Sequence, residues 1–132
     1  MEKNNDNEST LLRPEGKRIL NAPLVEMDLN KFIIKLKQEV SWVEKDQNSI
    51  TILKSDNYTV VLMGMKENAE LKTHNANGNI IIQVLEGEIN FKTDLHSSLL
   101  DKGQMIALQS NINHSVVAII ESFFLLTIYM EA

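Results

Sequence analysis

Two stretches decide how this chain is interpreted: HNANGNIIIQVLEGE, from His74 to Glu88, and GQMIALQSNINH, from Gly103 to His114. In each stretch a short apolar run is bounded by glycine and asparagine residues, which is typical of a β-strand between turns. The first stretch begins with a histidine, His74, and the second ends with one, His114. The pattern therefore predicts that two histidines belong to one small β-structure.

Short β-like runs continue on both sides of these stretches and alternate with turn residues. We expect eight or nine short strands over about 80 residues, which indicates an antiparallel barrel or sandwich. The expected strands lie near Ser49 to Lys54, Tyr58 to Met65, Glu70 to Asn75, Ile80 to Glu86, Glu88 to Lys92, Ser98 to Leu100, Met105 to Leu108, His114 to Ile120 and Phe123 to Tyr129.

The chain before residue 43 has a different pattern. Met1 to Thr10 is polar, and we expect a disordered tail. Leu11 to Met27 holds both prolines and is expected to form an extended arm, of a kind that often crosses to a second subunit. Asp28 suits the N-cap of one short α-helix of about ten residues, packed on the outside of the barrel, and Trp42 is expected to anchor the turn after it. The expected division is a tail over 1–10, an arm and helix over 11–42 and a β-barrel domain over 43–132.

Composition limits the function further. The chain has 132 residues, enough for one domain with one core, and its formal charge of −5 disfavours nucleic acid or an anionic membrane as partner. It has no cysteine, so a metal would need imidazole and carboxylate ligands. The N-terminus lacks the pattern of an export signal and no apolar run approaches the roughly 20 residues needed to cross a bilayer, so we expect a cytoplasmic protein without a membrane span.

The first stretch resembles the first motif of the cupin superfamily, whose members are small β-barrels with jelly-roll topology. That motif has a glycine, His-x-His, a glutamate and a second glycine. Aligning the second glycine on Gly87 places His74 and Ala76 at the two histidine positions and Ile80 at the glutamate position. Of the three metal ligands that this motif supplies in the family, one is retained.

The second stretch resembles the second cupin motif, which supplies the fourth ligand. Gly103 and His114 match at the right separation, whereas Gln109, Asn111 and Ala118 replace the proline, glycine and asparagine of the motif. The resemblance covers roughly residues 60–129. It implies an all-β fold, the cupin double-stranded β-helix (jelly-roll) barrel, with the arm and helix as an N-terminal addition.

The two retained positions, His74 and His114, are the candidate metal ligands. Two neutral imidazoles form a poor site for zinc, iron or manganese, because stable sites combine three or four protein ligands. We therefore expect no cofactor or a weakly bound divalent transition metal, and a site completed by water or substrate stays open. In the alternative, each histidine donates to a backbone carbonyl or to a bound ligand.

Strand alternation predicts which side chains surround the two histidines, since residues two apart face the same way. Glu70, Lys72, His74 and Ala76 are expected to share a face, and so are His114 and Val116. The cavity is then mostly apolar, whereas His96, in a polar turn segment, is expected to be exposed and away from it. The residues expected to line the pocket are Met63, Met65, Glu70, Lys72, Ala76, Ile80, Ile82 and Val116.

These observations favour a binding or accessory module in which the barrel holds a small-molecule ligand in a mostly apolar pocket. No nucleophile motif or phosphate-binding loop is visible, so no catalytic residue is assigned. The alternative is a metal-dependent enzyme of the dioxygenase or isomerase type, with His74, His114 and Glu70 as a third ligand. A third possibility is a structural or regulatory protein, and a homodimer through the arm is expected.

Overall fold

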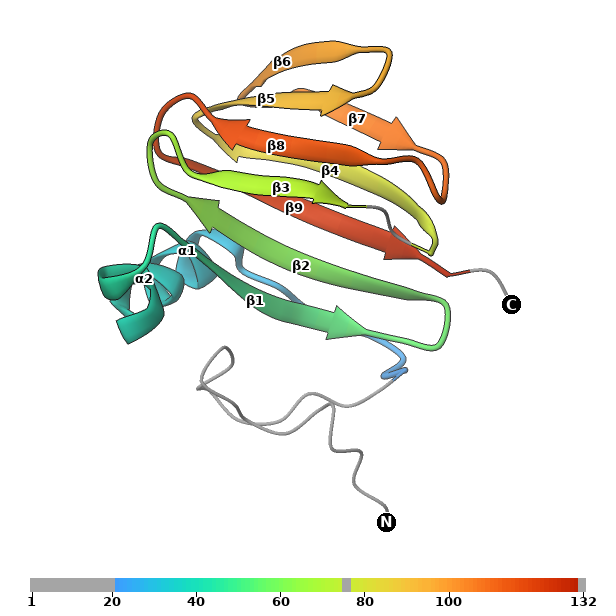
Figure 1. Cartoon of the computed structure of the whole chain (residues 1–132). Helices are drawn as coiled ribbons and strands as arrows, with labels where there is room; N and C mark the ends of the chain where they lie inside the picture. Colours follow the sequence, from blue (N-terminus) through green and yellow to red (C-terminus); the bar gives the residue numbers. More distant parts are fainter. Residues whose placement is uncertain (1–20, 75–76, 131–132) are drawn as a thin grey trace.

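The computed structural model describes residues 21–74 and 77–130; the expected tail, the first part of the arm and Ala76 lie outside these ranges. Within them the chain forms two β-sheets and a pair of helices (Figure 1). The strands are β1 (Gln47–Lys54), β2 (Tyr58–Met65), β3 (Glu70–His74), β4 (Asn79–Glu86), β5 (Glu88–Thr93), β6 (Ser97–Asp101), β7 (Met105–Leu108), β8 (His114–Ala118) and β9 (Ser122–Tyr129).

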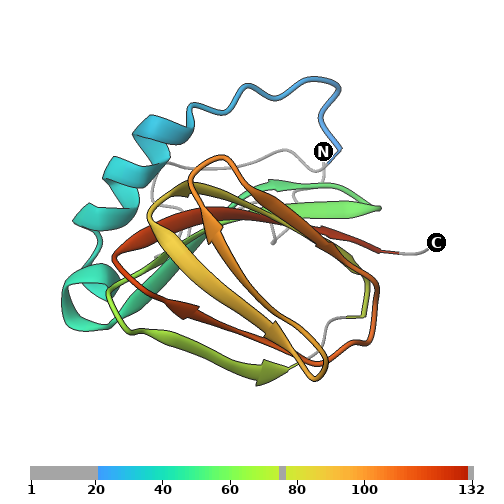
Figure 2. The same ribbon diagram turned by 90° about the horizontal axis from the view of Figure 1, so that it is seen from above.

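The two sheets have the strand order of a jelly roll. The five-stranded sheet has the order β1-β2-β9-β4-β7 and the four-stranded sheet the order β3-β8-β5-β6, and the described strand pairs are antiparallel. From β2 onward, consecutive strands mostly alternate between the sheets, so the chain winds around a common interior (Figures 1 and 2). The predicted all-β jelly-roll fold is confirmed, with β1 as an additional strand at the edge of the larger sheet.

Apolar side chains from both sheets fill the space between them. Ile80, Ile82 and Val84 alternate along β4 with less buried residues, and each is at most 3% exposed. This alternation is what a strand with one face toward a core requires. The other buried members of this interior cluster are Met65, Ala69, Ile89, Phe91, Leu100, Val116, Ala118 and Phe124.

Helix α1 (Leu29–Gln38) begins where the sequence predicts. The Asp28 side chain caps it by accepting a hydrogen bond from the Lys31 N–H at 3.2 Å. Its apolar side, including Ile33 and Leu36, packs in a second buried cluster with residues of β1, β2 and β9, among them Phe123. Figure 2 shows α1 beside the strands and not between the two sheets, so the expectation that it lies on the exterior is confirmed.

A further helical turn of five residues, α2 (Val40–Glu44), follows the expected helix. The break falls at Glu39, whose backbone is extended with φ −79° and ψ 150°. Trp42 lies within α2 and is 7% exposed, with its ring centroid 5.5 Å from that of Phe123. The tryptophan therefore anchors the short helix itself against the sheet, and not a turn after it.

Buried Asn48 of β1 holds the junction between the helices. Its side-chain NH2 donates to the Leu36 carbonyl at 3.2 Å and to Glu39 Oε1 at 2.9 Å, and its own oxygen accepts from the Ser49 N–H at 2.9 Å. The same Leu36 carbonyl also accepts the Glu39 N–H at 3.3 Å, so Asn48 adds a second donor at the end of α1. Asn48 thus fixes the helical pair to the edge of the larger sheet.

Candidate functional site

The strand register brings the two candidate metal-ligand positions together. His74 of β3 and His114 of β8 are directly paired across the four-stranded sheet. The structure therefore confirms that the two sequence stretches meet, although residues 75 and 76 between β3 and β4 are outside the described ranges.

Of the two histidines, His114 has a defined side-chain environment. It is 4% exposed, and its Nδ1 lies 2.9 Å from the Ile112 carbonyl oxygen. Because a carbonyl only accepts, Nδ1 carries the proton in this contact. The imidazole also stacks on Phe91 of β5, with ring centroids 5.5 Å apart and ring planes at 17°. His114 is thus packed into the wall of the barrel.

A bulge in β3 changes the faces that alternation predicts. Glu70 pairs with Val117 and Leu71 with Val116, and the register then shifts before His74. Leu71 packs against the interior cluster, whereas Glu70 and Lys72 are exposed. The structure therefore places Glu70 and Lys72 on the side of β3 away from the interior, and does not favour Glu70 as a third ligand beside His114.

The described residues do not fit the metal centre that the fold family implies. Ile80, at the position of the family's glutamate, is 3% exposed and belongs to the apolar interior cluster. Among the side chains that the structure describes, which do not include that of His74, no three of histidine, aspartate, glutamate or cysteine lie close enough to hold one ion. His74 and His114 supply two imidazoles, which is fewer donors than a stable site uses.

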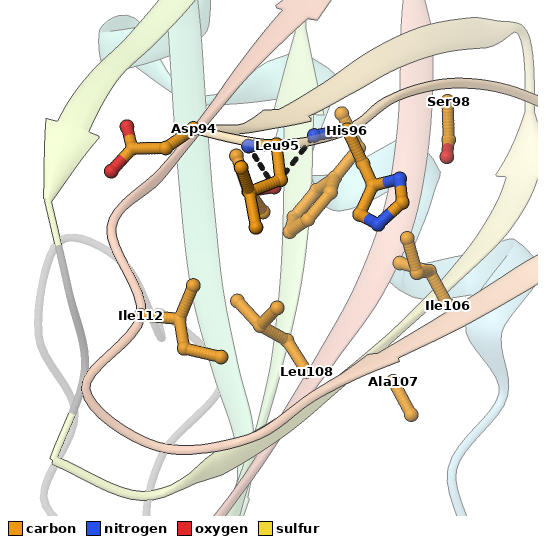
Figure 3. A pocket seen from close by; sticks show the side chains of 10 residues that line it. Asp94, Leu95, His96, Ser98, Ile106, Ala107, Leu108 and Ile112 are labelled. Atoms are coloured by element: carbon orange, nitrogen blue, oxygen red, sulfur yellow. Dashed lines mark hydrogen bonds between the residues drawn. The ribbon is translucent and has the colours of Figure 1, made fainter.

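A pocket of about 720 Å³ opens beside the wall that contains His114. It lies between β5, β6 and their connecting turn on one side, and β7 with the segment after it on the other (Figure 3). This volume is in the range of pockets that hold small molecules. The pocket is lined by Phe91, Thr93, Asp94, Leu95, His96, Ser98, Ile106, Ala107, Leu108 and Ile112.

The turn between β5 and β6 is held in shape by Thr93. Its hydroxyl accepts hydrogen bonds from the Leu95 N–H at 3.3 Å and the His96 N–H at 3.1 Å, and its own N–H donates to the His96 carbonyl at 2.8 Å. These bonds present Leu95 toward the side chains of Leu108 and Ile112 (Figure 3). Leu95 is 87% exposed, so a large apolar side chain lies uncovered at the pocket.

The lining of this pocket differs from the residues expected from sequence. Met65, Ile80, Ile82 and Val116 are buried in the interior cluster, and Met63 packs against it. None of these five is among the residues that line the pocket, and their role in ligand binding stays a prediction. His96 is exposed as expected, and it lines this pocket, a position that the sequence pattern did not indicate.

Two signals in the sequence point to this pocket. Leu95 interrupts a polar turn segment, and Ile112 stands between two asparagines. Exposed apolar residues that gather into one patch can mark a ligand-binding groove, whereas a single one does not. The sequence alone does not place the two loops together. Their proximity depends on how their strands pair in the folded structure.

The comparison with known proteins rests on structure, since neither a family model nor a curated protein matches the sequence. A cupin-2 domain-containing protein from Shewanella frigidimarina superimposes with a TM-score of 0.64 over 78% of this chain and 93% of its own, at 15% identity. The chain has a cupin fold. KdgF from Halomonas sp., with a TM-score of 0.63, is similar over 68% of this chain and 85% of its own length, also at 15% identity.

Other proteins that share the cupin fold with this chain include enzymes. A salicylate 1,2-dioxygenase variant from Pseudoaminobacter salicylatoxidans superimposes with a TM-score of 0.75 over 86% of this chain, at 14% identity, but this chain spans only 37% of that protein. A conserved Streptococcus pyogenes protein of unknown function superimposes with a TM-score of 0.62 over 65% of this chain and 75% of its own, at 19% identity. A shared fold does not specify a reaction, because function depends on the residues of the site.

No helix within the described residues has both the length and the apolar composition that a membrane span requires.

Proposed function

We propose that this cupin-fold protein binds a small, mostly apolar molecule in the pocket between the β5–β6 turn and β7. The observation that carries the proposal is the pocket itself, with a volume of about 720 Å³ and six apolar side chains among the ten that line it. Burial of apolar surface is the main favourable term for a ligand in such a pocket. The proposed role is binding, with no catalytic step assigned.

The position of Leu95 supports the proposal. Its side chain is 87% exposed in the free protein, and Ile112, on the opposite side of the pocket, is 39% exposed. A ligand between them would remove both from water. Fully burying a side chain of this size contributes about 1.5–3 kcal/mol, so these two residues alone would favour an apolar ligand appreciably.

The experiment is a titration with N-phenyl-1-naphthylamine, an uncharged dye whose fluorescence rises in apolar surroundings. The wild-type protein should bind it saturably. A variant with Leu95→Glu and Ile112→Glu should bind at least about tenfold more weakly, because each change places a carboxylate beside the apolar ligand. Both positions are partly or largely exposed, so the fold should tolerate the changes.

The matched control is Leu99→Glu. Leu99 is 60% exposed on β6 but does not line the pocket. This variant should bind the dye within about twofold of wild type. Equal weakening by Leu99→Glu and by the double change would mean that the dye binds elsewhere, and absence of saturable binding to the wild type would refute the proposal.

The second candidate function is a metal-dependent enzyme with a reduced site at His74 and His114. The register that pairs these two positions is the observation in its favour. The test is metal content together with dioxygenase and isomerase assays on the metal-loaded protein. If His74→Ala and His114→Ala each leave the metal content unchanged, this candidate fails.

A homodimer and residence in the cytoplasm are further parts of the proposal, and both rest on the sequence. Light scattering after size-exclusion chromatography of the full chain, compared with a chain that starts at Asp28, tests the dimer. A dimer that is lost on removal of the arm would assign the contact to the arm. A full chain that is monomeric would overturn the dimer.

A further inference from the structure

Two polar side chains border the apolar pocket and form no side-chain hydrogen bond within the described part of the chain. His96 takes part in hydrogen bonds through its backbone N–H and carbonyl, both to Thr93, while no described residue is a partner of its imidazole. The Ser98 hydroxyl likewise has no partner among the described residues. In Figure 3 the His96 ring and the Ser98 hydroxyl lie on the same side of the pocket, near Ile106.

The other polar side chains of the lining are arranged differently. The Thr93 hydroxyl already accepts two backbone N–H groups of the turn. The Asp94 carboxylate points away from the space between Leu95, Leu108 and Ile112 (Figure 3). His96 and Ser98 therefore provide the hydrogen-bonding capacity on one side of an otherwise apolar pocket.

The charges of the lining restrict the ligand further. Of the ten lining residues, none is lysine or arginine, and Asp94 is the one carboxylate. An anionic ligand would lose its hydration among aliphatic side chains that offer no strong counter-charge. A cationic ligand would lose its hydration in the same way, because the Asp94 carboxylate does not face the pocket.

We propose that the ligand is an uncharged molecule with an apolar body and one hydroxyl or carbonyl group, which His96 and Ser98 bind by hydrogen bonds. This inference rests on the proposed function and adds a ligand class and an orientation. The apolar body lies between Leu95, Leu108 and Ile112, and the polar group is directed toward β6. His96 and Ser98 are specificity-determining residues in this account, and no chemical step is assigned to them.

The experiment measures how well three probes with the same ring system displace N-phenyl-1-naphthylamine. The probes are naphthalene, 2-naphthol and 2-naphthoate. In the wild-type protein 2-naphthol should displace the dye at about five- to tenfold lower concentration than naphthalene, which is the gain from one hydrogen bond. The anion 2-naphthoate should be at least about tenfold weaker than 2-naphthol.

Variants assign the difference to the two side chains. His96→Leu, which replaces the imidazole with an apolar side chain of similar size, should reduce the advantage of 2-naphthol over naphthalene to about twofold or less. Ser98→Ala should reduce it partly. The matched control is Ser97→Ala, because the Ser97 hydroxyl donates to Asn90 Oδ1 at 3.0 Å and does not line the pocket; it should leave the advantage unchanged.

The outcomes separate this inference from the proposed function. If the dye does not bind the wild type, the proposed function fails. If the dye binds but 2-naphthol and naphthalene displace it equally, or His96→Leu leaves their ratio unchanged, the ligand class proposed here is overturned while the pocket stands. Stronger displacement by 2-naphthoate than by 2-naphthol would overturn the requirement for an uncharged ligand.

Discussion

The His114 imidazole lies against the Phe91 ring, with centroids 5.5 Å apart and planes at 17°, and Phe91 is at the same time part of the pocket lining. His114 is the position at which the fold family has its fourth metal ligand. In this chain the ring contributes to the packing behind the pocket, and Ile112, whose carbonyl lies 2.9 Å from Nδ1, is itself a lining residue. The His114 side chain thus contacts two residues of the pocket lining, Phe91 and Ile112.

We predict that the size of the ring at position 114 matters more for stability than its nitrogens. His114→Ala should lower the free energy of unfolding by about 2–4 kcal/mol, because it leaves a cavity beside Phe91. His114→Phe should cost only about 1 kcal/mol, since it keeps the ring contact and loses the hydrogen bond to Ile112. Urea unfolding measures both, and equal losses would contradict this account.

Gly87 and Gly103 offer a matched pair of substitutions. Both have positive φ, 93° and 87°, which disfavours a side chain at either position. A Cβ at Gly87 would also meet the Ser122 hydroxyl and the Glu121 carbonyl, whereas a Cβ at Gly103 would meet nothing within 4 Å. Gly103→Ala should therefore cost about 1 kcal/mol and Gly87→Ala clearly more, about 3 kcal/mol or above. Thermal and urea unfolding compare the two variants. Similar losses of unfolding free energy would show that the Ser122 side chain moves to accommodate the added methyl group.

Asn48 is predicted to keep the helical pair on the larger sheet. Asn48→Ala removes the donor to the Leu36 carbonyl and to Glu39, and should lower the free energy of unfolding by about 1–3 kcal/mol. Amide hydrogen exchange should accelerate more in α1 and α2 than in β4 and β9. Asn57→Ala, at an exposed turn residue, is the control and should change stability by less than about 0.5 kcal/mol. Uniform acceleration over the whole chain would argue against a local role.

Protein purified without a histidine tag is predicted to contain far less than one equivalent of transition metal. The reason is the donor set: Ile80 occupies the interior where the fold family has a glutamate, and two imidazoles hold a metal weakly. Elemental analysis of the wild type and of the His74→Ala/His114→Ala variant measures this. Close to one equivalent in the wild type, lost in the variant, would favour the enzyme alternative.

Most of the fold could be predicted from the sequence because strand patterns and turn residues are local signals. The short apolar run of β4 and the Asn-Gly turn before it can be recognised without knowledge of any partner strand. Helix α2 could not be predicted in this way, since its five residues carry too little periodicity and their packing depends on Phe123, far along the chain. Val40, the first residue of α2, is 68% exposed, so an apolar residue here does not mark a buried helix face.

The candidate site was less accessible to sequence reasoning. Strict alternation along β3 placed Glu70 and Lys72 toward the interior, but a bulge between Leu71 and His74 changes the phase of the strand. The pocket depends on the approach of the β5–β6 turn to β7, two segments in different sheets. His96 could be recognised as a turn residue, but its place beside the pocket follows only from this approach.

NMR can show whether the space between the β5–β6 turn and β7 is the ligand site. Amide signals of the labelled full chain are followed while N-phenyl-1-naphthylamine is added. We expect the largest shifts in residues 93–98, in residues 106–108 and at Ile112. Shifts concentrated on α1, or spread evenly over both sheets, would contradict it.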